Sequence, residues 1–337
     1  MLKAHKLNRI FTNIGIMPRD PFTYKYRPKL LKDFQMNPEL RGILNTLIAI
    51  EKLNILLAGN SGSGKTSLIH AIIREYYGKN ISLDHDNIMS INTLKEQGIS
   101  YYRNEVRVFC QTSSCIEGKR KILILDDIDI INEQSQQVFR NCIDKYSNNV
   151  CFIASCCNTQ KVIDSLQSRM DIIKIKPHTC EELTAIAKNI ALKENIIYDE
   201  DVLQFITKVC NGSVRILVNY LEKFKLINAP IDLDLSSRLC TNISFNELNN
   251  YTNACIENKL SNALIIISKL VQKGYSVTDV LDNYFTFIKH TDMLSEEQKY
   301  KIIPFVCKYI TIFHNIHEDE IELSFFTNNI VKLLAEN

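Results

Sequence analysis

The sequence predicts an α/β domain with a parallel sheet, followed by an all-helical region. Apolar runs suited to strands alternate with amphipathic segments as far as residue 177. A glycine-rich stretch, GNSGSGKT at 59–66, joins one apolar run to a helix-like segment. Beyond Pro177 only helical periodicity remains. Strands that alternate with helices are typical of a parallel sheet with helices on both sides.

Each strand of the predicted sheet is a short apolar run. KILILDD, at 121–127, is apolar on consecutive positions, as expected of a strand that is covered on both faces. The segment 65–77 has apolar residues near helical spacing, and a second helix is expected between the second and third strands. The four expected strands are 53–58, 121–127, 150–156 and 172–177.

The helical region opens with a capping signal. Thr179 and Glu182 have the spacing of a capping box, in which each side chain accepts a hydrogen bond from the other residue's N–H. Two more helices, 200–210 and 213–227, complete a three-helix unit. Four or five further helical stretches follow residue 240, punctuated by Gly274, Ser295 and Pro304. The expected domains are 1–177, 178–236 and 237–337.

Composition and charge narrow the class of protein. The chain is 45% hydrophobic and 23% charged with a net charge of +2, which is typical of a globular chain. Its charged start, MLKAHKLNRIF, is unlike a signal peptide, and no apolar run has the ~20 residues of a membrane span. The 11 cysteines include no CxxC pair, so we expect reduced thiols and no zinc site, in cytoplasm or nucleus. Residues 1–36 hold eight Lys/Arg and two Asp, and form either a phosphate-contacting segment or a solvated tail.

The stretch 59–66 fits a phosphate-binding loop, Gly-x4-Gly-Lys-Thr, with a strand before it and a helix after it. Glycines let backbone N–H groups converge on phosphates, and the amino end of the helix adds partial positive charge. Lys65 would reach the β- and γ-phosphates of ATP, and the Thr66 hydroxyl would bind Mg²⁺. The expected nucleotide-binding residues here are Gly59, Asn60, Ser61, Gly62, Ser63, Gly64, Lys65, Thr66 and Ser67.

Two carboxylates end the strand 121–127. Asp126 would lie beside the loop and hold the Mg²⁺ hydration shell, while Asp127 would orient the attacking water. The alternative is a solvent-facing acidic turn at the end of a strand, which the neighbouring phosphate loop makes the weaker interpretation.

Five segments in order resemble the small subunits of replication factor C, the AAA+ sliding-clamp loaders of eukaryotes, archaea and some large DNA viruses. The resemblance covers residues 21 to 225, and beyond 240 it rests on helical content and length. It implies an AAA+ core with a parallel sheet, a three-helix lid and an all-α collar. The segments are KYRPKLLKDF (25–34), GNSGSGKTS (59–67), KILILDDIDIINEQSQQVFRNCID (121–144), VCFIASCCNTQKVIDSLQSRM (150–170) and GSVRILVNYLE (212–222).

The resemblance also implies roles for residues outside the phosphate loop. Asn158 falls at the sensor-1 position, where it would hydrogen-bond the γ-phosphate or the attacking water; the alternative is a polar residue that leaves a strand. Arg215 matches sensor 2 and would contact the phosphates of its own chain's nucleotide; the alternative is a surface arginine near a helix start. Arg169, in Ser168-Arg169-Met170, matches the arginine finger that projects into the neighbouring subunit's ATP site, with Met170 in place of the family's cysteine. The residues that would line the adenine pocket, largely through backbone, are Thr23, Tyr26, Arg27, Pro28 and the neighbourhood of Gln35.

Asp127 departs from the family, which usually has glutamate there. Aspartate retracts the carboxylate by ~1.5 Å, and a displacement of about 1 Å can cost on the order of a hundredfold in rate. We therefore expect a slow ATPase that assembly with clamp and DNA stimulates.

The partners that the resemblance implies are other clamp-loader subunits in a hetero-oligomer, expected to be a pentamer, a PCNA-like sliding clamp and primer–template DNA. A viral source would place the protein at viral replication sites. The segment Asn92 to Arg103 occupies the place of a family segment near the DNA backbone. Candidate phosphate contacts, each equally explained by a solvated basic face, are Arg103, Arg107, Lys119 and Arg120.

Three other functions are compatible with the phosphate loop. An ATP-binding structural subunit with little hydrolysis is favoured by Asp127 alone. A helicase loader or Holliday-junction motor is disfavoured by the KYRP segment at 25–28, and a small-molecule kinase by the helical tail and the Ser-Arg element.

Overall fold

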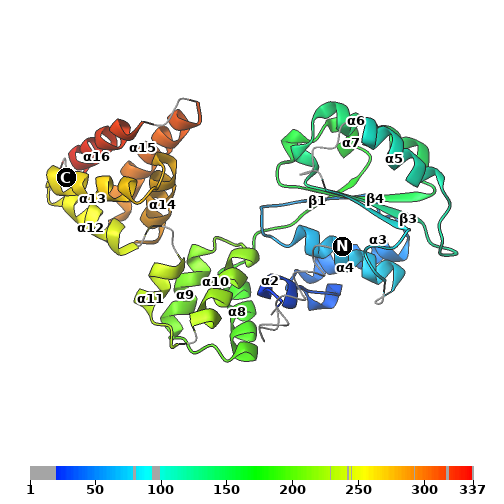
Figure 1. The fold of residues 1–337 in the computed structure, drawn as a ribbon, viewed down its shortest axis with the longest axis horizontal. Helices are drawn as coiled ribbons and strands as arrows, with labels where there is room; N and C mark the ends of the chain where they lie inside the picture. Colours follow the sequence, from blue (N-terminus) through cyan, green and yellow to red (C-terminus); the bar gives the residue numbers. More distant parts are fainter. Residues whose placement is uncertain are drawn as a thin grey trace, which may run out of the picture. The chain divides into compact units, whose positions relative to one another are not determined.

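The computed structural model describes residues 20–78, 81–92, 99–227, 229–240, 243, 245–291, 293–315 and 319–335. The first 19 residues of the basic segment, and residues 93–98 of the segment expected near DNA, lie outside that range. The chain divides into two compact units (Figure 1): Met1–Ile190 with Asn211–Glu222, and Ala191–Cys210 with Lys223–Asn337. The division into domains at 177 and 236 stays a prediction.

The first unit holds a five-stranded parallel sheet in the order β2-β3-β4-β1-β5, which confirms the predicted sheet. The strands are β1 (Ile55–Ala58), β2 (Ile88–Asn92), β3 (Lys121–Asp126), β4 (Val150–Cys156) and β5 (Asp171–Lys174). The sequence analysis missed β2. It lies at an edge of the sheet and contains a serine and an asparagine, so it lacks the continuous apolar run of the central strands.

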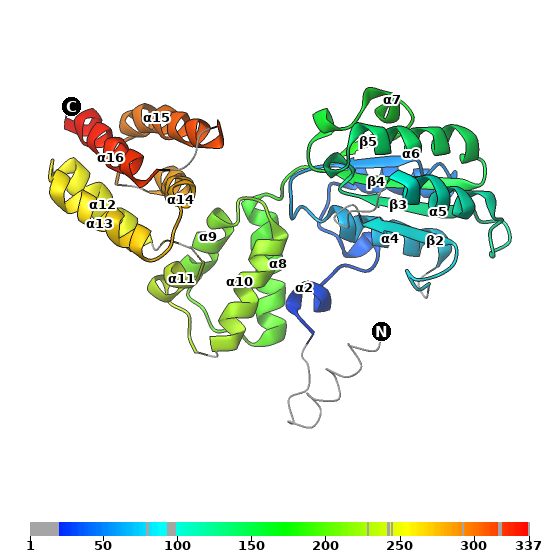
Figure 2. The ribbon, with the colours of Figure 1, turned by 45° about the horizontal axis from the view of Figure 1, so that its top comes forward.

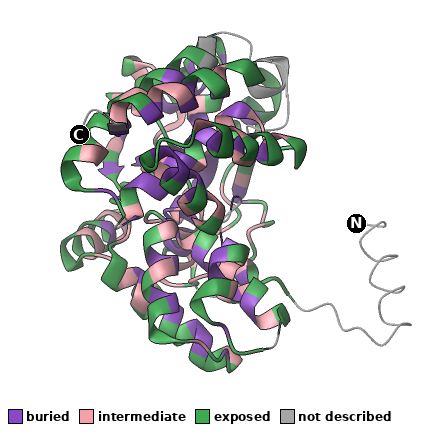
Figure 3. Cartoon of the chain, turned by 90° about the vertical axis from the view of Figure 1, so that its left-hand side faces the viewer, coloured by how far each residue is buried: buried purple, intermediate pink, exposed green. Residues whose placement is uncertain are grey.

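Helices cover both faces of the sheet because successive strand residues point to opposite sides. Leu56 and Leu125 pack with α5 (Ile99–Gln111) and α6 (Glu133–Tyr146). On the other face, Leu57 packs with the next two helices. These are α3 (Pro38–Ala49) and α4 (Lys65–Tyr77). Figures 1 and 2 show the two layers on either side of the strands, and Figure 3 colours the residues of the chain by burial.

The predicted capping box forms at the start of α8 (Cys180–Glu194). Thr179 N–H donates to Glu182 Oε2 over 3.0 Å, and Glu182 N–H donates to Thr179 Oγ1 over 3.2 Å. The helices that follow in the sequence are α9 (Glu200–Val209), α10 (Val214–Ile227) and α11 (Leu233–Cys240).

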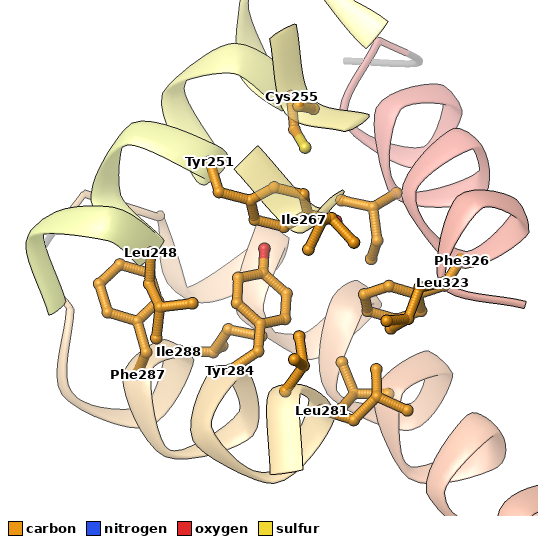
Figure 4. Packing of buried hydrophobic residues seen from close by; sticks show 14 of the residues in the cluster. Leu248, Tyr251, Cys255, Ile267, Leu281, Tyr284, Phe287, Ile288, Leu323 and Phe326 are labelled. Atoms are coloured by element: carbon orange, nitrogen blue, oxygen red, sulfur yellow. The ribbon is translucent and has the colours of Figure 1, made fainter. Parts of the chain in front are cut away.

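Five helices make the carboxy-terminal part of the described chain: α12 (Phe245–Ile256), α13 (Leu260–Gln272), α14 (Val277–His290), α15 (Glu296–Asn315) and α16 (Glu320–Ala335). They enclose an apolar core in which Tyr251, Tyr284 and Phe326 lie together (Figure 4). The Tyr251 hydroxyl donates to Thr327 Oγ1 over 3.1 Å, so the buried phenol keeps a hydrogen bond. An all-α region after the sheet is therefore confirmed.

Pro304 does not interrupt a helix, contrary to the sequence-based expectation. It lies inside α15. Proline there costs about 3 kcal/mol by removing an N–H and crowding the preceding turn. The same helix buries Ile302, Val306 and Tyr309 in the core, and burial of three such side chains outweighs that cost.

Among the described residues, none of the helices combines the length and hydropathy needed to span a bilayer.

Candidate functional site

Three polar segments meet at the carboxyl edge of the sheet. One follows β1, one ends β3 at Asp126, and one follows β4 at Cys157 and Asn158. Strand β4 lies between β3 and β1, with Cys156 opposite Ala58 and Ala154 opposite Leu125. Because the strands are parallel, segments separated by about 100 residues in the sequence emerge side by side.

The loop between β1 and α4 depends on two glycines. Gly62 and Gly64 have φ of +76° and +91°, a region that side chains rarely adopt. A Cβ on Gly62 would lie 2.1 Å from Ser213 Oγ and 3.5 Å from Arg215 Cβ. Gly62 therefore lets the start of α10 approach the loop, and this approach brings Arg215 to it.

The loop has unused polar capacity suited to an anion. Gly64 is the N-cap of α4 and makes no side-chain cap, so the first N–H groups of the helix have no capping side chain. Ser63 is buried, and no hydrogen-bond partner for its Oγ occurs within the described residues. A phosphate group would satisfy both features, so the residues present fit a bound nucleotide.

Lys65 is only 6% exposed and is held by the loop itself. Its Nζ donates to the carbonyl oxygens of Gly59 (2.8 Å) and Asn60 (3.0 Å), and it lies 3.4 Å from Cys157 Sγ. The loop thus fixes a positive charge beside the segment that follows β4.

A hydrogen-bond chain links the loop to the ends of β3 and β4. Thr66 Oγ1 donates to Asp126 Oδ2 over 3.0 Å, and Ser155 Oγ donates to Asp126 Oδ1 over 2.5 Å. The N–H of Asp127 then donates to Ser155 Oγ over 2.9 Å. Thr66 and Asp126 therefore bring together a hydroxyl and a carboxylate, oxygen groups of the kind that bind Mg²⁺. Sequence reasoning missed Ser155, which is a fully buried polar residue in an apolar strand.

Asp127 has an unusual backbone and a perturbed carboxyl group. Its φ is +54°, which turns the chain sharply after β3. Burial and the neighbouring Asp126 carboxylate raise the pKa of Asp127, while the Lys65 ammonium opposes that rise. The Asp127 carboxyl group is therefore close enough to Asp126 and Lys65 to interact with both charges.

Asp129 orders the segment that carries Asn158. Its Oδ2 accepts hydrogen bonds from the N–H groups of Cys157 (3.1 Å) and Asn158 (3.0 Å). Asn158 Oδ1 accepts from the N–H of Gln160 over 2.9 Å, at the start of η3 (Thr159–Lys161). Since the side-chain oxygen of Asn158 is used in this cap, its amide NH₂ is the end suited to a phosphate oxygen or a water molecule.

Gln136 joins the loops after β3 and β4, and sequence reasoning missed it. Its Nε2 donates to the carbonyl oxygens of Ile128 (3.3 Å), Ile131 (3.1 Å) and Lys161 (2.9 Å). Its Oε1 accepts from Ile163 N–H over 2.9 Å. The sequence could have revealed Gln136 as a polar residue among the apolar positions of α6. In the structure its exposed fraction is 1%.

Replacing Gln136 with alanine is expected to lower the free energy of unfolding by about 2–4 kcal/mol, because it leaves buried backbone groups without partners. Urea denaturation of the full chain measures this loss. Gln137→Ala, at an exposed position next in the sequence, is the control and is expected to stay within about 0.5 kcal/mol of wild type. Equal stability of the two variants would contradict the prediction.

Arg27 contacts the helix that follows the phosphate loop through its side chain. Its Nε donates to Ser67 Oγ over 3.0 Å. Burial, with Arg74 nearby, lowers the pKa of Arg27, and burial with these two arginines lowers the pKa of His70 to about 4. His70 is therefore neutral near pH 7.

The other expected adenine-pocket residues lie beside Arg27 in the sequence. Thr23, Tyr26 and Pro28 are partly buried, whereas Gln35 is exposed. Their contact with a nucleotide stays a prediction.

Arg169 lies at the opposite edge of the sheet. Strand β5 pairs with β1 so that Asp171 is opposite Ile55 and Lys174 is opposite Ala58. The phosphate loop follows Ala58, but Arg169 precedes Asp171, so three strand steps of about 3.3 Å each separate the two ends. Arg169 is also held there, because its Nε donates to Asp144 Oδ1 over 2.5 Å.

Two family models match the chain. Residues 55–178 match the ATPase family associated with various cellular activities (AAA), and residues 244–309 match the replication factor C C-terminal domain. Together with the relatives below, these two matches support the resemblance to the replication factor C small subunits.

Several curated replication factor C proteins are similar to this chain over most of its length. The putative replication factor C small subunit of Acanthamoeba polyphaga mimivirus is 26% identical over 287 residues, covering 85% of this chain and 88% of the relative. The replication factor C small subunit of Methanococcus maripaludis (strain DSM 14266) is 26% identical, covering 84% and 89%. Replication factor C subunit 4 of Saccharomyces cerevisiae is 26% identical, covering 84% and 87%.

Among solved structures, the Thermotoga maritima RuvB Holliday junction branch migration motor has a TM-score of 0.52. It is 18% identical and covers 68% of this chain and 79% of its own. This likeness concerns the AAA+ fold alone.

The four basic residues predicted to contact DNA differ in their surroundings. Arg103 and Arg107 are exposed on α5. Lys119 pairs with Glu51 over 3.0 Å and lies 4.4 Å from the Tyr76 ring centre. Arg120 Nη1 donates to the carbonyl of Ser147 over 3.2 Å. The last two are therefore held by their own chain, while the first two are open to solvent.

Proposed function

We propose that this chain is an ATP-hydrolysing subunit of a sliding-clamp loader, which helps to open a clamp and place it on primer–template DNA during replication. The relatives' name, replication factor C, supports a role in clamp loading. One structural observation carries the proposal. The groups suited to binding ATP lie at the carboxyl edge of the sheet, whereas Arg169 lies at the amino edge, and this separation favours an action on a neighbouring subunit's nucleotide.

The chain's own residues would bind the triphosphate in a fixed orientation. The N–H groups of the loop, the Ser63 hydroxyl and Lys65 would contact the phosphates, with Arg215 approaching from α10. Thr66 and Asp126 would hold Mg²⁺, which supplies charge neutralisation at the phosphates.

Hydrolysis would need a positioned water and a cation from the adjacent subunit. Asp127 accepts a hydrogen bond from the attacking water, and the Asn158 amide donates to that water or to a γ-phosphate oxygen. The water oxygen bonds to the γ-phosphorus as the bond to the β–γ bridging oxygen breaks, giving ADP and phosphate. Arg169 of the next subunit would stabilise the charge that develops, so that turnover depends on assembly.

The expected partners follow from this dependence. They are other loader subunits in a hetero-oligomeric, expected pentameric, ring, a PCNA-like clamp and primer–template DNA. The helical region expected at 237–337, part of which matches the replication factor C C-terminal domain, would form the collar that holds the subunits together. Arg103 and Arg107 are the stronger candidates for DNA phosphates because they are exposed. The protein would act wherever its DNA is replicated, in nucleus, cytoplasm or a viral replication site.

ATPase assays test the proposal directly. Turnover is measured for the chain alone, for the chain assembled with partner subunits, and for that assembly with clamp and primed DNA. We expect low turnover alone and an increase at each addition. A chain that turns over ATP equally well in all three conditions would instead be a self-sufficient enzyme, and the clamp-loader proposal would fail.

An ATP-binding structural subunit is the second candidate, favoured by the short Asp127 side chain. Asp127→Glu is expected to raise turnover of the assembled complex by about tenfold, because it extends the carboxylate by ~1.5 Å toward the water. Steady-state ATPase assays at saturating ATP measure the change, with ATP affinity as the control that should not change. Unchanged or lower turnover would contradict the view that Asp127 limits the rate.

A further inference from the structure

Arg169 is held by two elements of its own chain. Its Nε donates to Asp144 Oδ1 on α6 over 2.5 Å. Its Nη1 donates to the carbonyl of Ser165 over 2.6 Å and lies 3.3 Å from Ser168 Oγ. These hydrogen bonds use Nε and Nη1 and leave Nη2 outside them, on a side chain that is 29% exposed.

Asp144 is placed to orient this arginine. Its other oxygen, Oδ2, lies 3.3 Å from Arg140 Nε one helical turn earlier on α6, so a second cation steadies the carboxylate. The hydrogen bond from Arg169 lowers the pKa of Asp144, which keeps it ionised near pH 7. Helix α6 runs from the carboxyl edge of the sheet to the amino edge, and Asp144 lies in its last turn, beside the turn that precedes β5.

The ion pair between Arg169 and Asp144 is expected to add little to the free energy of unfolding. The side chains of Arg169 and Asp144 are 29% and 40% exposed, and solvent-exposed ion pairs contribute little to folding. A long arginine side chain that must act on another molecule does gain from being ordered beforehand, because fewer conformations are lost when it engages. Contacts with Asp144 and the Ser165 carbonyl define the plane of the guanidinium while leaving Nη2 available.

We infer that Asp144 is a positioning residue for the trans-acting arginine, holding Arg169 by its Nε so that Nη2 is presented to the triphosphate of the neighbouring subunit. This inference rests on the proposed function. Asp144 acts through Arg169 and does not itself touch the nucleotide. Its own chain's phosphate loop lies at the opposite edge of the sheet, so ATP binding by the same chain does not depend on it.

The test uses the full chain assembled with its partner subunits, and measures kcat and KM for ATP. Asp144→Ala is expected to lower kcat by about tenfold with KM and melting temperature unchanged. Asp144→Asn keeps an oxygen acceptor for Nε and is expected to restore most of kcat. Added to Arg169→Ala, Asp144→Ala is expected to have no further effect, because the group it positions is already absent.

A second exposed pair gives a matched control. Asp234 Oδ2 lies 2.5 Å from Arg238 Nη2 on α11, so Asp234→Ala removes the same kind of ion pair elsewhere and should leave kcat unchanged. If Asp144→Ala matches Asp234→Ala while Arg169→Ala is slow, the inference fails and the proposed function stands. If Arg169→Ala itself has wild-type kcat, the proposed function fails. A lower melting temperature, or a loss that persists in the Arg169→Ala background, would give Asp144 a structural role and overturn the inference.

Discussion

Replacing Arg169 with alanine is expected to lower ATP turnover of the assembled complex by about a thousandfold, the scale measured when a trans arginine is absent from phosphoryl-transfer sites. The loss should appear in the neighbouring subunit's site. ATP binding by the mutated chain should stay at the wild-type level, because Arg169 lies at the amino edge of the sheet and the phosphate loop at the carboxyl edge.

Two measurements separate these effects. Steady-state ATPase assays of the assembled complex report turnover, and titration of the isolated chain with a fluorescent ATP analogue reports binding. Arg238→Ala removes an exposed arginine that is also paired with an aspartate, and it serves as the control. Turnover within about threefold of wild type, or weakened ATP binding by the mutated chain itself, would contradict an action in trans.

The central elements of the fold were predictable because burial on both faces leaves a strong signal. Strands β3 and β4 are buried along almost their whole length, and their apolar runs gave nearly the observed bounds. The helix α4 (Lys65–Tyr77) was predicted with its observed ends, since a glycine flanks it on either side. The edge strand β2 and the proline inside α15 were mispredicted, because there packing in the tertiary structure outweighs the local pattern.

In the site, sequence spacing located the motif residues but not the groups that arrange them. Ser155, Asp129 and Gln136 act through hydrogen bonds to residues 25 to 29 positions away. No local pattern encodes such contacts, because they exist only after parallel strands bring the loops together. Buried polar residues in apolar segments were the one available sign, and they indicate a hydrogen bond without identifying its partner.

Arg169 also shows which information comes from the sequence and which from the structure. The resemblance placed a finger in Ser168-Arg169-Met170, but only the register of β5 against β1 puts that arginine at the edge remote from its own phosphate loop. This separation from its own phosphate loop supports the proposed role in trans.

Lys65→Met is expected to weaken ATP binding by about a hundredfold, because it removes a buried ammonium while keeping a side chain of similar length. A charge-assisted hydrogen bond is worth about 1.5–3 kcal/mol, and 2.7 kcal/mol corresponds to a factor of about one hundred. The fold should persist, since the methionine stem can occupy the space of the lysine stem. Isothermal titration of the full chain with ATP measures the affinity.

The control for this variant is Lys52→Met. Lys52 pairs with Asp171 over 3.1 Å at the amino edge of the same sheet, and its side chain is 62% exposed, so its loss should leave ATP affinity unchanged. In the wild-type chain, Lys65 Nζ donates hydrogen bonds to the carbonyl oxygens of Gly59 and Asn60. Without the ammonium group, those two oxygens would repel a phosphate. The lost attraction and this repulsion both weaken ATP binding. Equal ATP affinity for the Lys65 and Lys52 variants would mean that the loop does not hold a triphosphate, and every step that depends on Arg169 would lose its substrate.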